Sequence, residues 1–313
     1  MALIESSAPG KVILFGEHAV VYGKPAIAVP VTEVQVIVTA EPAPLGSGLT
    51  LVASNLDKSF RLSTASQDEP LAAAARFTLA HLSVPEPDAT LIISSTIPIA
   101  GGLGSGTAVS TAIVRTLARF LDRPLKTVEV SALVFKVEKI HHGTPSGIDN
   151  TVIAYEQPVY FVRGQPIQRL NVITPFTLLI GNTGTRSPTK KAIEHVRRGR
   201  KRDPARYDAL FDQIGDIVDE AHQAIEAGDV DALGPLMDDN HELLIKVGVS
   251  SPKLDKLVEA ARFAGAMGAK LSGAGRGGNM IALVEDDVAE EVAEALKEAG
   301  ATRVINTTVT TTD

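Results

Sequence analysis

Apolar residues follow strand-like and helix-like spacings in turn along the first half of the chain. Residues 11–16 and 26–40 are rich in Val and Ile and predict strands, and residues 49–54 and 60–64 predict a hairpin. Further elements are predicted as helices at 70–82, 105–121 and 127–142. Residues 89–100 predict a strand followed by a proline-bearing loop, and residues 159–162 predict another strand. Gly143 predicts the end of the third helix.

Helical patterns dominate after about residue 170. Helices are predicted at 188–200, 204–227, 230–247, 252–264 and 287–299, and strands at 176–183, 269–272, 279–285 and 301–309. Strands mixed with helix pairs, behind a strand-rich first half, predict two α+β domains. We expect the boundary between 165 and 175, which gives domains of residues 1–170 and 171–313.

Composition narrows the class of protein. The chain has 313 residues, of which 44% are apolar and 21% charged, as in globular proteins. It contains no cysteine, which excludes disulfides, thiolate metal sites and a cysteine nucleophile and fits a cytoplasmic protein. No apolar stretch is long enough to span a membrane, and the N-terminal residues do not resemble a secretory signal.

Charge argues against a nucleic-acid partner. The formal net charge is −7. The basic run at 197–202 ends a predicted helix and has no aromatic residues near it, so a solvated helix face explains it better than a nucleic-acid surface.

A glycine-rich stretch precedes the helix predicted from Ser105. Residues 99–108 read IAGGLGSGTA, with four glycines within six positions. A flexible, capped loop is one interpretation. A phosphate-binding loop explains the number of glycines better, because glycines let backbone N–H groups at a helix start approach a phosphate closely. No Lys follows Gly106, so this is not a Walker A loop.

Two other stretches combine glycine with polar residues. Residues 8–26 place Lys11, Glu17 and His18 around a short apolar strand, where a hairpin with surface charges is the alternative. Residues 270–284 match G-x-G-x-x-G, but they lead into a strand and not a helix, which argues against a dinucleotide site.

Two carboxylates lie eleven residues apart in the middle of the chain. Glu138 is on a predicted helix, and Asp149 is presented by a turn rich in Gly, Pro and Ser. They could converge on a metal ion or a substrate, or be an ordinary helix-end acid and turn Asp. His141 and His142 are adjacent and lack the H-E-x-x-H spacing, which argues against zinc.

These stretches together resemble the three motifs of the GHMP kinases, in the family's order and across nearly the whole chain. PGKVILFGEHAVVYGKPAIA is similar to the first motif of the members that phosphorylate mevalonate. Further along the chain, HHGTPSGIDN, GNTGTRSPTKKAIEHVR and DDNHELLIKVGVSS also resemble stretches of those members. Galactose-specific members carry an acid where this chain has Val20 and Val21. The resemblance implies an N-terminal α/β domain (ribosomal-protein-like) and a C-terminal ferredoxin-like α+β domain.

The resemblance also implies a reaction and roles. ATP would phosphorylate (R)-mevalonate to 5-phosphomevalonate with Mg²⁺ as cofactor. Asp149 would lie at the substrate hydroxyl as base or orienting anion, with Lys11 beside it, and Glu138 would bind Mg²⁺. Glu17 and His18 would line the mevalonate side. The ATP-binding loops would comprise Gly101, Gly102, Leu103, Gly104, Ser105, Gly106, Thr107, Ser272, Gly273 and Gly275.

Two departures from the family pattern qualify these expectations. The second motif usually reads G-L-G-S-S-A, and its second serine helps to hold Mg²⁺; here Gly106 stands at that position. Arg276 occupies the glycine-rich third motif and would reach a phosphate or point to solvent. The alternatives are another kinase of the family, such as one acting on phosphomevalonate, and a non-catalytic ligand-binding relative. Dimers are common in the family, so a homodimer is compatible with the resemblance.

Overall fold

Two compact units make up the chain, and each contains separate stretches of sequence. The computed structural model describes residues 3–54, 57–98, 102–142, 145–185 and 189–311. The first unit comprises Met1–Gly10, Val34–Pro98 and Gly104–Glu156; the second comprises Lys11–Glu33, Ile99–Leu103 and Gln157–Asp313. Strands β1 (Ile4–Phe15) and β2 (Ala26–Pro42) therefore contribute residues to both units.

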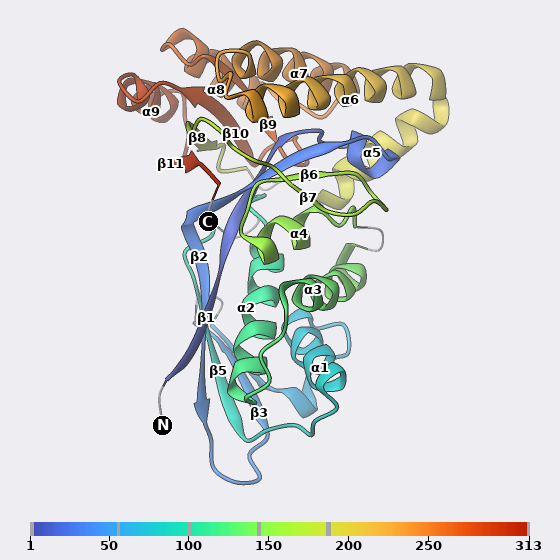
Figure 1. The fold of residues 1–313 in the computed structure, drawn as a ribbon, viewed down its shortest axis with the longest axis vertical. Coiled ribbons are helices and arrows are strands. Elements are labelled where there is room, and N and C mark those ends of the chain that lie inside the picture. Colours follow the sequence, from blue (N-terminus) through green and yellow to red (C-terminus); the bar gives the residue numbers. More distant parts are fainter. Residues whose placement is uncertain (1–2, 55–56, 99–101, 143–144, 186–188, 312–313) are drawn as a thin grey trace. The chain divides into compact units, whose positions relative to one another are not determined.

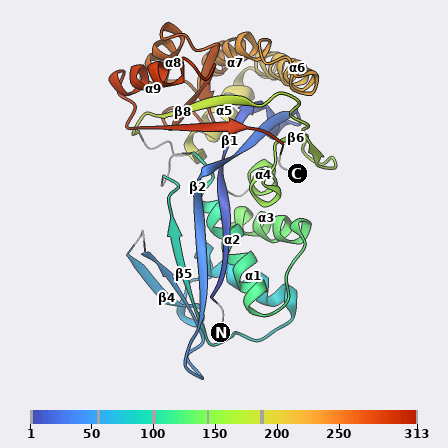
Figure 2. The same ribbon diagram turned by 60° about the vertical axis from the view of Figure 1, so that its left-hand side comes forward.

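The first unit is a sheet with helices packed on it (Figures 1 and 2). Its other strands are β3 (Leu49–Ala53), β4 (Lys58–Arg61) and β5 (Ala89–Ser95). β3 pairs parallel to β5 and antiparallel to β4, and β5 pairs antiparallel to the second half of β2. The helices are α1 (Pro70–Leu82), α2 (Ser105–Phe120), α3 (Thr127–His142) and α4 (Ile148–Tyr155).

Alternation of side chains along β2 builds the core of the first unit. Val34, Val36 and Val38 are at most 1% exposed, whereas Gln35 and Ile37 between them are partly accessible. This period of two places one apolar face of the strand against the helices. On α2, Ile113 and Leu117 are fully buried at a spacing of one helical turn, so the helix lies with its apolar face inward.

The second unit contains an antiparallel sheet in the order β11-β8-β10-β9. Its strands are β8 (Phe176–Asn182), β9 (Gly268–Ser272), β10 (Asn279–Val284) and β11 (Arg303–Val309). The helices are α5 (Thr189–Arg202), α6 (Pro204–Ala227), α7 (Leu233–Val247), α8 (Pro252–Phe263) and α9 (Ala289–Glu298). Helices fall between β8 and β9 and between β10 and β11, which gives the βαββαβ pattern of a ferredoxin-like fold.

Smaller elements complete the second unit. The turn η1 (Ala19–Tyr22) follows β1 and packs on α6. Strand β6 (Val159–Phe161) pairs with the start of β2, and β7 (Gln168–Arg169) pairs with β6. Across the described residues, no helix is both long and apolar enough to cross a membrane.

Most predicted elements are confirmed, and the helices predicted at 70–82 and 204–227 have the observed bounds. The turn predicted around Asp149 is wrong, because residues 148–155 form α4. Its β-branched residues disfavour a helix locally, but Val152 and Ile153 are fully buried, and this packing overrides the propensity. The second hairpin strand ends at Arg61, before a 3₁₀ turn. Gly143 lies outside the described residues.

Candidate active site

The first motif turns sharply after β1. Gly16 has φ +95°, and a Cβ there would lie 2.6 Å from the backbone and side chain of Ala26. Only glycine allows both this backbone conformation and this close approach. The turn directs Glu17 and His18 into the interior of the second unit, where they are 0% and 8% exposed.

Glu17 forms an ion pair with Lys270 of β9. The Lys270 ammonium donates hydrogen bonds to Glu17 Oε1 and, at 2.9 Å, to the carbonyl of Leu271. Neither charged side chain is exposed to solvent. Among the described residues, the second carboxylate oxygen, Oε2, has no hydrogen-bond partner. A buried acceptor without a partner is costly, so Oε2 retains unused hydrogen-bonding capacity at some cost in free energy.

Burial and charge pairing act in opposite directions on this pair. Burial raises the pKa of Glu17, while Lys270 and the backbone N–H groups of Glu17 and Gly273 oppose the rise. Burial likewise lowers the pKa of Lys270, and Glu17 opposes that shift. Each charge therefore depends on the other to remain ionised in the interior.

His18 is a neutral hydrogen-bond donor. Its Nε2 lies 3.1 Å from the carbonyl of Ala274, and burial lowers the pKa of the ring to about 4. Because a carbonyl can only accept, Nε2 must carry the proton, which leaves Nδ1 as an acceptor. His18 has φ +62°, an uncommon conformation for a residue with a side chain. The bond to Ala274 links the first motif to the third.

Further backbone contacts join the three motifs in the second unit. The amide of Lys11 donates to the carbonyl of Leu103 at 3.0 Å, and Lys11 itself is 4% exposed. The hydroxyl of Ser272 donates to the carbonyl of Ile13 at 2.8 Å. Gly102, next to Leu103, has φ +84° and is exposed. The second and third motifs thus both contact β1.

The third-motif loop is shaped by positive φ angles. Gly273 and Gly275 have φ +85° and +74°, and a Cβ on Gly275 would lie 2.0 Å from the carbonyl of Val249. Arg276 also has positive φ, is exposed, and donates through its amide to the same carbonyl at 2.7 Å. Its guanidinium lies 3.4 Å from the carbonyl of Gly248. The arginine side chain therefore rests on the outside of the loop.

In the first unit, the remainder of the second motif opens α2. Gly104 is the N-cap residue, with φ +73° and no side chain to cap the helix. Ser105 is partly buried and Gly106 is exposed. A Cβ on Gly106 would meet nothing within 4 Å. The N–H groups of this first turn therefore have no side-chain cap, as a phosphate-binding helix start requires.

Thr107 lies in this first turn and contacts Glu138 of α3. Its hydroxyl donates a hydrogen bond to Glu138 Oε1 at 2.5 Å. Thr107 is 3% exposed and Glu138 is partly buried. The structure thus brings together two of the predicted site residues, one assigned to the nucleotide and one to the metal.

Asp149 occupies the first turn of α4, after the N-cap Gly147. It is partly buried. The next residue, Asn150, is 5% exposed and donates to the Ser131 hydroxyl of α3 at 2.9 Å. Ser131 in turn donates to the Asn150 carbonyl at 3.3 Å. These bonds fix the start of α4 against the helix that carries Glu138.

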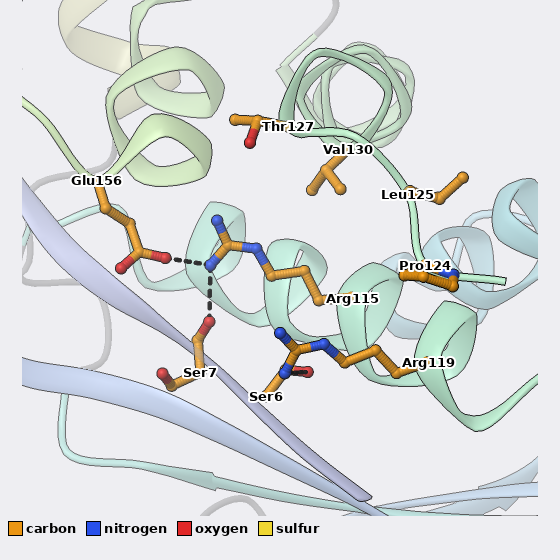
Figure 3. Close-up of a pocket in the computed structure, with 9 residues that line it drawn as sticks. All are labelled: Ser6, Ser7, Arg115, Arg119, Pro124, Leu125, Thr127, Val130 and Glu156. Carbon is orange, nitrogen blue, oxygen red and sulfur yellow. Dashed lines mark hydrogen bonds and ion pairs between the residues drawn. The ribbon is translucent and has the colours of Figure 1, made fainter. Parts of the chain in front are cut away.

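A cavity of about 360 Å³ lies elsewhere in the first unit, between the start of β1 and helices α2 and α3. Figure 3 shows Arg115 bridging the Glu156 carboxylate and the Ser7 carbonyl. A further bond at 2.7 Å reaches the carbonyl of Ala154 at the end of α4. No predicted site residue lines this cavity. The hydrogen bonds of Arg115 instead hold β1, α2 and the end of α4 together.

The predicted residues divide between the two units. Glu138, Asp149 and the stretch from Gly104 to Thr107 belong to the first unit, whereas the second contains Lys11, Glu17, His18, Gly102, Leu103, Ser272, Gly273 and Gly275. Gly101 lies outside the described residues. Sequence reasoning missed Lys270 and Asn150. The only signal for Lys270 was that it is the one charged residue of the strand GAKLS.

Comparisons with known proteins identify the family of the chain. Residues 70–157 match the family described as GHMP kinases N terminal domain, and residues 221–302 match GHMP kinases C terminal. The mevalonate kinase of Pyrococcus abyssi is 37% identical over 97% of this chain and 95% of its own length. The chain belongs to the GHMP kinases.

This GHMP kinase is similar to further mevalonate kinases in sequence and fold. That of Thermococcus gammatolerans is 36% identical over 96% of this chain and 94% of its own. The crystal structure of L. major mevalonate kinase in complex with R-mevalonate superposes with a TM-score of 0.86 at 29% identity, covering 98% of this chain and 96% of that one. The Methanococcus jannaschii enzyme gives 0.87 at 28% identity, covering 99% of both. The predicted fold class is confirmed.

The donor set of this GHMP kinase suits Mg²⁺ better than a transition metal. Among the residues that the structure describes, no three His, Cys, Asp or Glu side chains lie close enough to hold a metal ion together. Glu138 and Thr107 offer hard oxygen atoms. Mg²⁺ is commonly bound through one or two carboxylates, with phosphate oxygens and water completing its shell. These residues therefore fit the ion of a magnesium–nucleotide complex.

Proposed function

We propose that this chain transfers the γ-phosphoryl group of ATP to the 5-hydroxyl of (R)-mevalonate, giving 5-phosphomevalonate and ADP. The observation that carries the proposal is the similarity to mevalonate kinases over 97% of the chain. The three motifs support it, since each is present in the expected order. The reaction belongs to the mevalonate route to isoprenoids.

Residues of both units have roles in the proposed transfer. The substrate hydroxyl attacks the γ-phosphorus as the bond to ADP breaks, so the protein must position the reactants in line and neutralise charge. Asp149 acts on the hydroxyl as base or orienting anion. Lys11 supplies a positive charge that offsets the negative charge of the transferring phosphoryl group.

Glu17 and His18 are proposed to contact mevalonate, a molecule that carries both hydroxyl and carboxylate groups. Glu17 Oε2 offers an acceptor for a hydroxyl group. The neutral ring of His18 offers an acceptor at Nδ1, because Nε2 bonds to Ala274. Both groups are held by the interior of the protein, which fixes the orientation of the substrate before reaction.

Mg²⁺ would neutralise negative charge on the ATP phosphates when it is bound. Glu138 would hold it, with Thr107 at its side. The loop of residues 101–107 and the third-motif residues Ser272, Gly273 and Gly275 would contact the nucleotide through backbone N–H groups. In this assignment ATP is a co-substrate and Mg²⁺ the only cofactor.

Release of ADP tests the function directly. Purified protein is assayed with ATP, Mg²⁺ and one alcohol at a time: mevalonate, phosphomevalonate, galactose or homoserine. We expect turnover with mevalonate. Preference for phosphomevalonate would assign another reaction of the family, and no turnover with any alcohol would favour a non-catalytic binding role.

We further propose that the protein acts in the cytoplasm as a homodimer, without a nucleic-acid partner. The absence of cysteine suits a reducing compartment. Light scattering after size-exclusion chromatography measures the oligomeric state, and a monomeric mass would reject the dimer.

A further inference from the structure

Two threonines one turn apart on α2 use their hydroxyls differently. Thr111 donates to the backbone carbonyl of Thr107 at 2.9 Å, which is the usual bond of a threonine inside a helix. Thr107 instead donates to Glu138 on another helix. Both side chains are buried, at 0% and 3% exposed. The bond to Glu138 is therefore a specific tertiary contact and not a local property of threonine.

The start of α2 offers few alternatives for this contact. The N-cap is Gly104, and the helix has no side-chain cap, so the Thr107 hydroxyl is not needed at the helix end. Gly106 has no side-chain oxygen. Thr107 thus supplies the oxygen that meets Glu138, at the place where the helix start would receive phosphates.

We infer that Thr107 is a positioning residue that holds the Glu138 carboxylate for the metal of the metal–nucleotide complex. The inference rests on the proposed function for the role of Glu138. A glutamate has three rotatable side-chain bonds, and a short hydrogen bond from a buried hydroxyl selects one arrangement. A carboxylate has several acceptor sites, and this bond uses one of them, on Oε1.

Removing the hydroxyl should therefore weaken metal binding. Partners that orient a metal ligand typically contribute about 10- to 100-fold in affinity. Thr107→Val keeps the shape of the side chain and removes the hydrogen bond. Thr107→Ser keeps the hydroxyl and removes only a methyl group. Thr111→Val makes the same chemical change one turn along the same helix, away from Glu138.

The experiment measures Mn²⁺, as a paramagnetic probe for Mg²⁺, bound to the full chain with a non-hydrolysable ATP analogue and no alcohol. Electron paramagnetic resonance gives the free Mn²⁺, and thermal unfolding reports folding of each variant. We expect about 10- to 100-fold weaker Mn²⁺ binding for Thr107→Val. Thr107→Ser and Thr111→Val should bind close to wild type.

Wild-type Mn²⁺ affinity in Thr107→Val, or an equal loss in Thr111→Val, would overturn the inference. If Thr107→Val does not fold, Thr107→Ala replaces it and the same outcomes decide. The proposed function is tested separately by alcohol turnover. If the wild type phosphorylates no alcohol but Thr107→Val weakens Mn²⁺ binding, the inference stands and the proposed function is rejected. If the wild type phosphorylates mevalonate but Thr107→Val binds Mn²⁺ like the wild type, only the inference is rejected.

Discussion

Lys270 and Glu17 lie 253 positions apart in the chain and form an ion pair from which solvent is excluded. Removing one partner of such a pair leaves an uncompensated buried charge, which typically costs about 3–5 kcal/mol. Lys270→Met should lower the free energy of unfolding by this amount, measured by urea denaturation. The double variant Glu17→Gln/Lys270→Met should recover part of it. Equal stability of Lys270→Met and wild type would contradict the buried pair.

The cost of Lys270→Met should also depend on pH. Burial already raises the pKa of Glu17, and loss of the lysine raises it further. Between the ordinary and the raised pKa, the folded protein holds a proton that the unfolded chain has released, so stability falls as pH rises. The difference in unfolding free energy from wild type should be larger at pH 8 than at pH 5. A difference that is constant with pH would remove Glu17 as its cause.

His18 should make the protein sensitive to acid. Its folded-state pKa of about 4 lies below the ordinary 6.5, so the unfolded chain binds the proton first as pH falls. The contribution of the neutral His18 ring to the free energy of unfolding is complete above pH 6.5. It is lost as pH falls toward 4, by roughly 3 kcal/mol at most. His18→Gln should remove the share of this fall in unfolding free energy that His18 causes, while His241 keeps its own share. Burial also lowers the pKa of His241 to about 4, so His241→Gln should reduce the fall in unfolding free energy over the same pH range. An unchanged pH profile in His18→Gln would contradict a buried neutral ring.

Asp149→Asn should lower turnover strongly and leave ATP affinity nearly unchanged. Loss of a general base typically costs about 10²- to 10⁴-fold. Initial rates with mevalonate and calorimetric titration with ATP measure the two effects. Asp122→Asn is the matched control, because Asp122 is an exposed acid of the same unit. Near-native turnover in Asp149→Asn would remove this residue from the mechanism.

Lys11→Met should lower turnover strongly and change the melting temperature only slightly. The predicted task needs a positive charge, and loss of one electrostatic donor at a reacting centre costs about 10²- to 10³-fold. Lys24→Met is the control in the same unit, since Lys24 is 36% exposed and pairs with Asp212 at the surface. A wild-type rate combined with a much lower melting temperature would make Lys11 a structural residue.

Gly104→Val should abolish nucleotide binding with a modest loss of stability. Gly104 has φ +73°, where a β-branched residue is strained by about 1–2 kcal/mol or more. Its side chain would also keep phosphate from the backbone. Gly46→Val imposes a similar strain at φ +80° in an exposed loop of the same unit and should keep ATP affinity. Unchanged affinity in Gly104→Val, measured by calorimetry, would show that the loop does not contact phosphate.

Long amphipathic segments could be predicted from the sequence, and short packed ones could not. The 24 residues of α6 carry a helical pattern from end to end. Helix α4 has eight residues, four of which are β-branched, and its stability comes from packing on α2 and α3. Local helix propensity does not depend on those packing partners. For this reason Asp149 was predicted on a turn, whereas it lies on a helix.

The same limit applies to the site. Glu17 and His18 stand in a recognisable local motif, but the counter-ion of Glu17 comes from the other end of the chain. Thr107 was predicted from the sequence as a residue of the ATP-binding loop. Its hydrogen bond to Glu138 follows from the packing of α3 and could not be predicted. Residue types are local information, whereas partners depend on the tertiary fold.

The interleaving of the two units has a consequence for recombination. The chain changes unit after residues 10, 33, 98, 103 and 156. A fragment beginning after residue 156 contains Lys270 without Glu17, and thus a buried ammonium with no counter-charge. A chimera that joins the first half of this protein to the second half of a relative must match that pair across its junction. The second unit therefore cannot be exchanged as one contiguous segment of sequence.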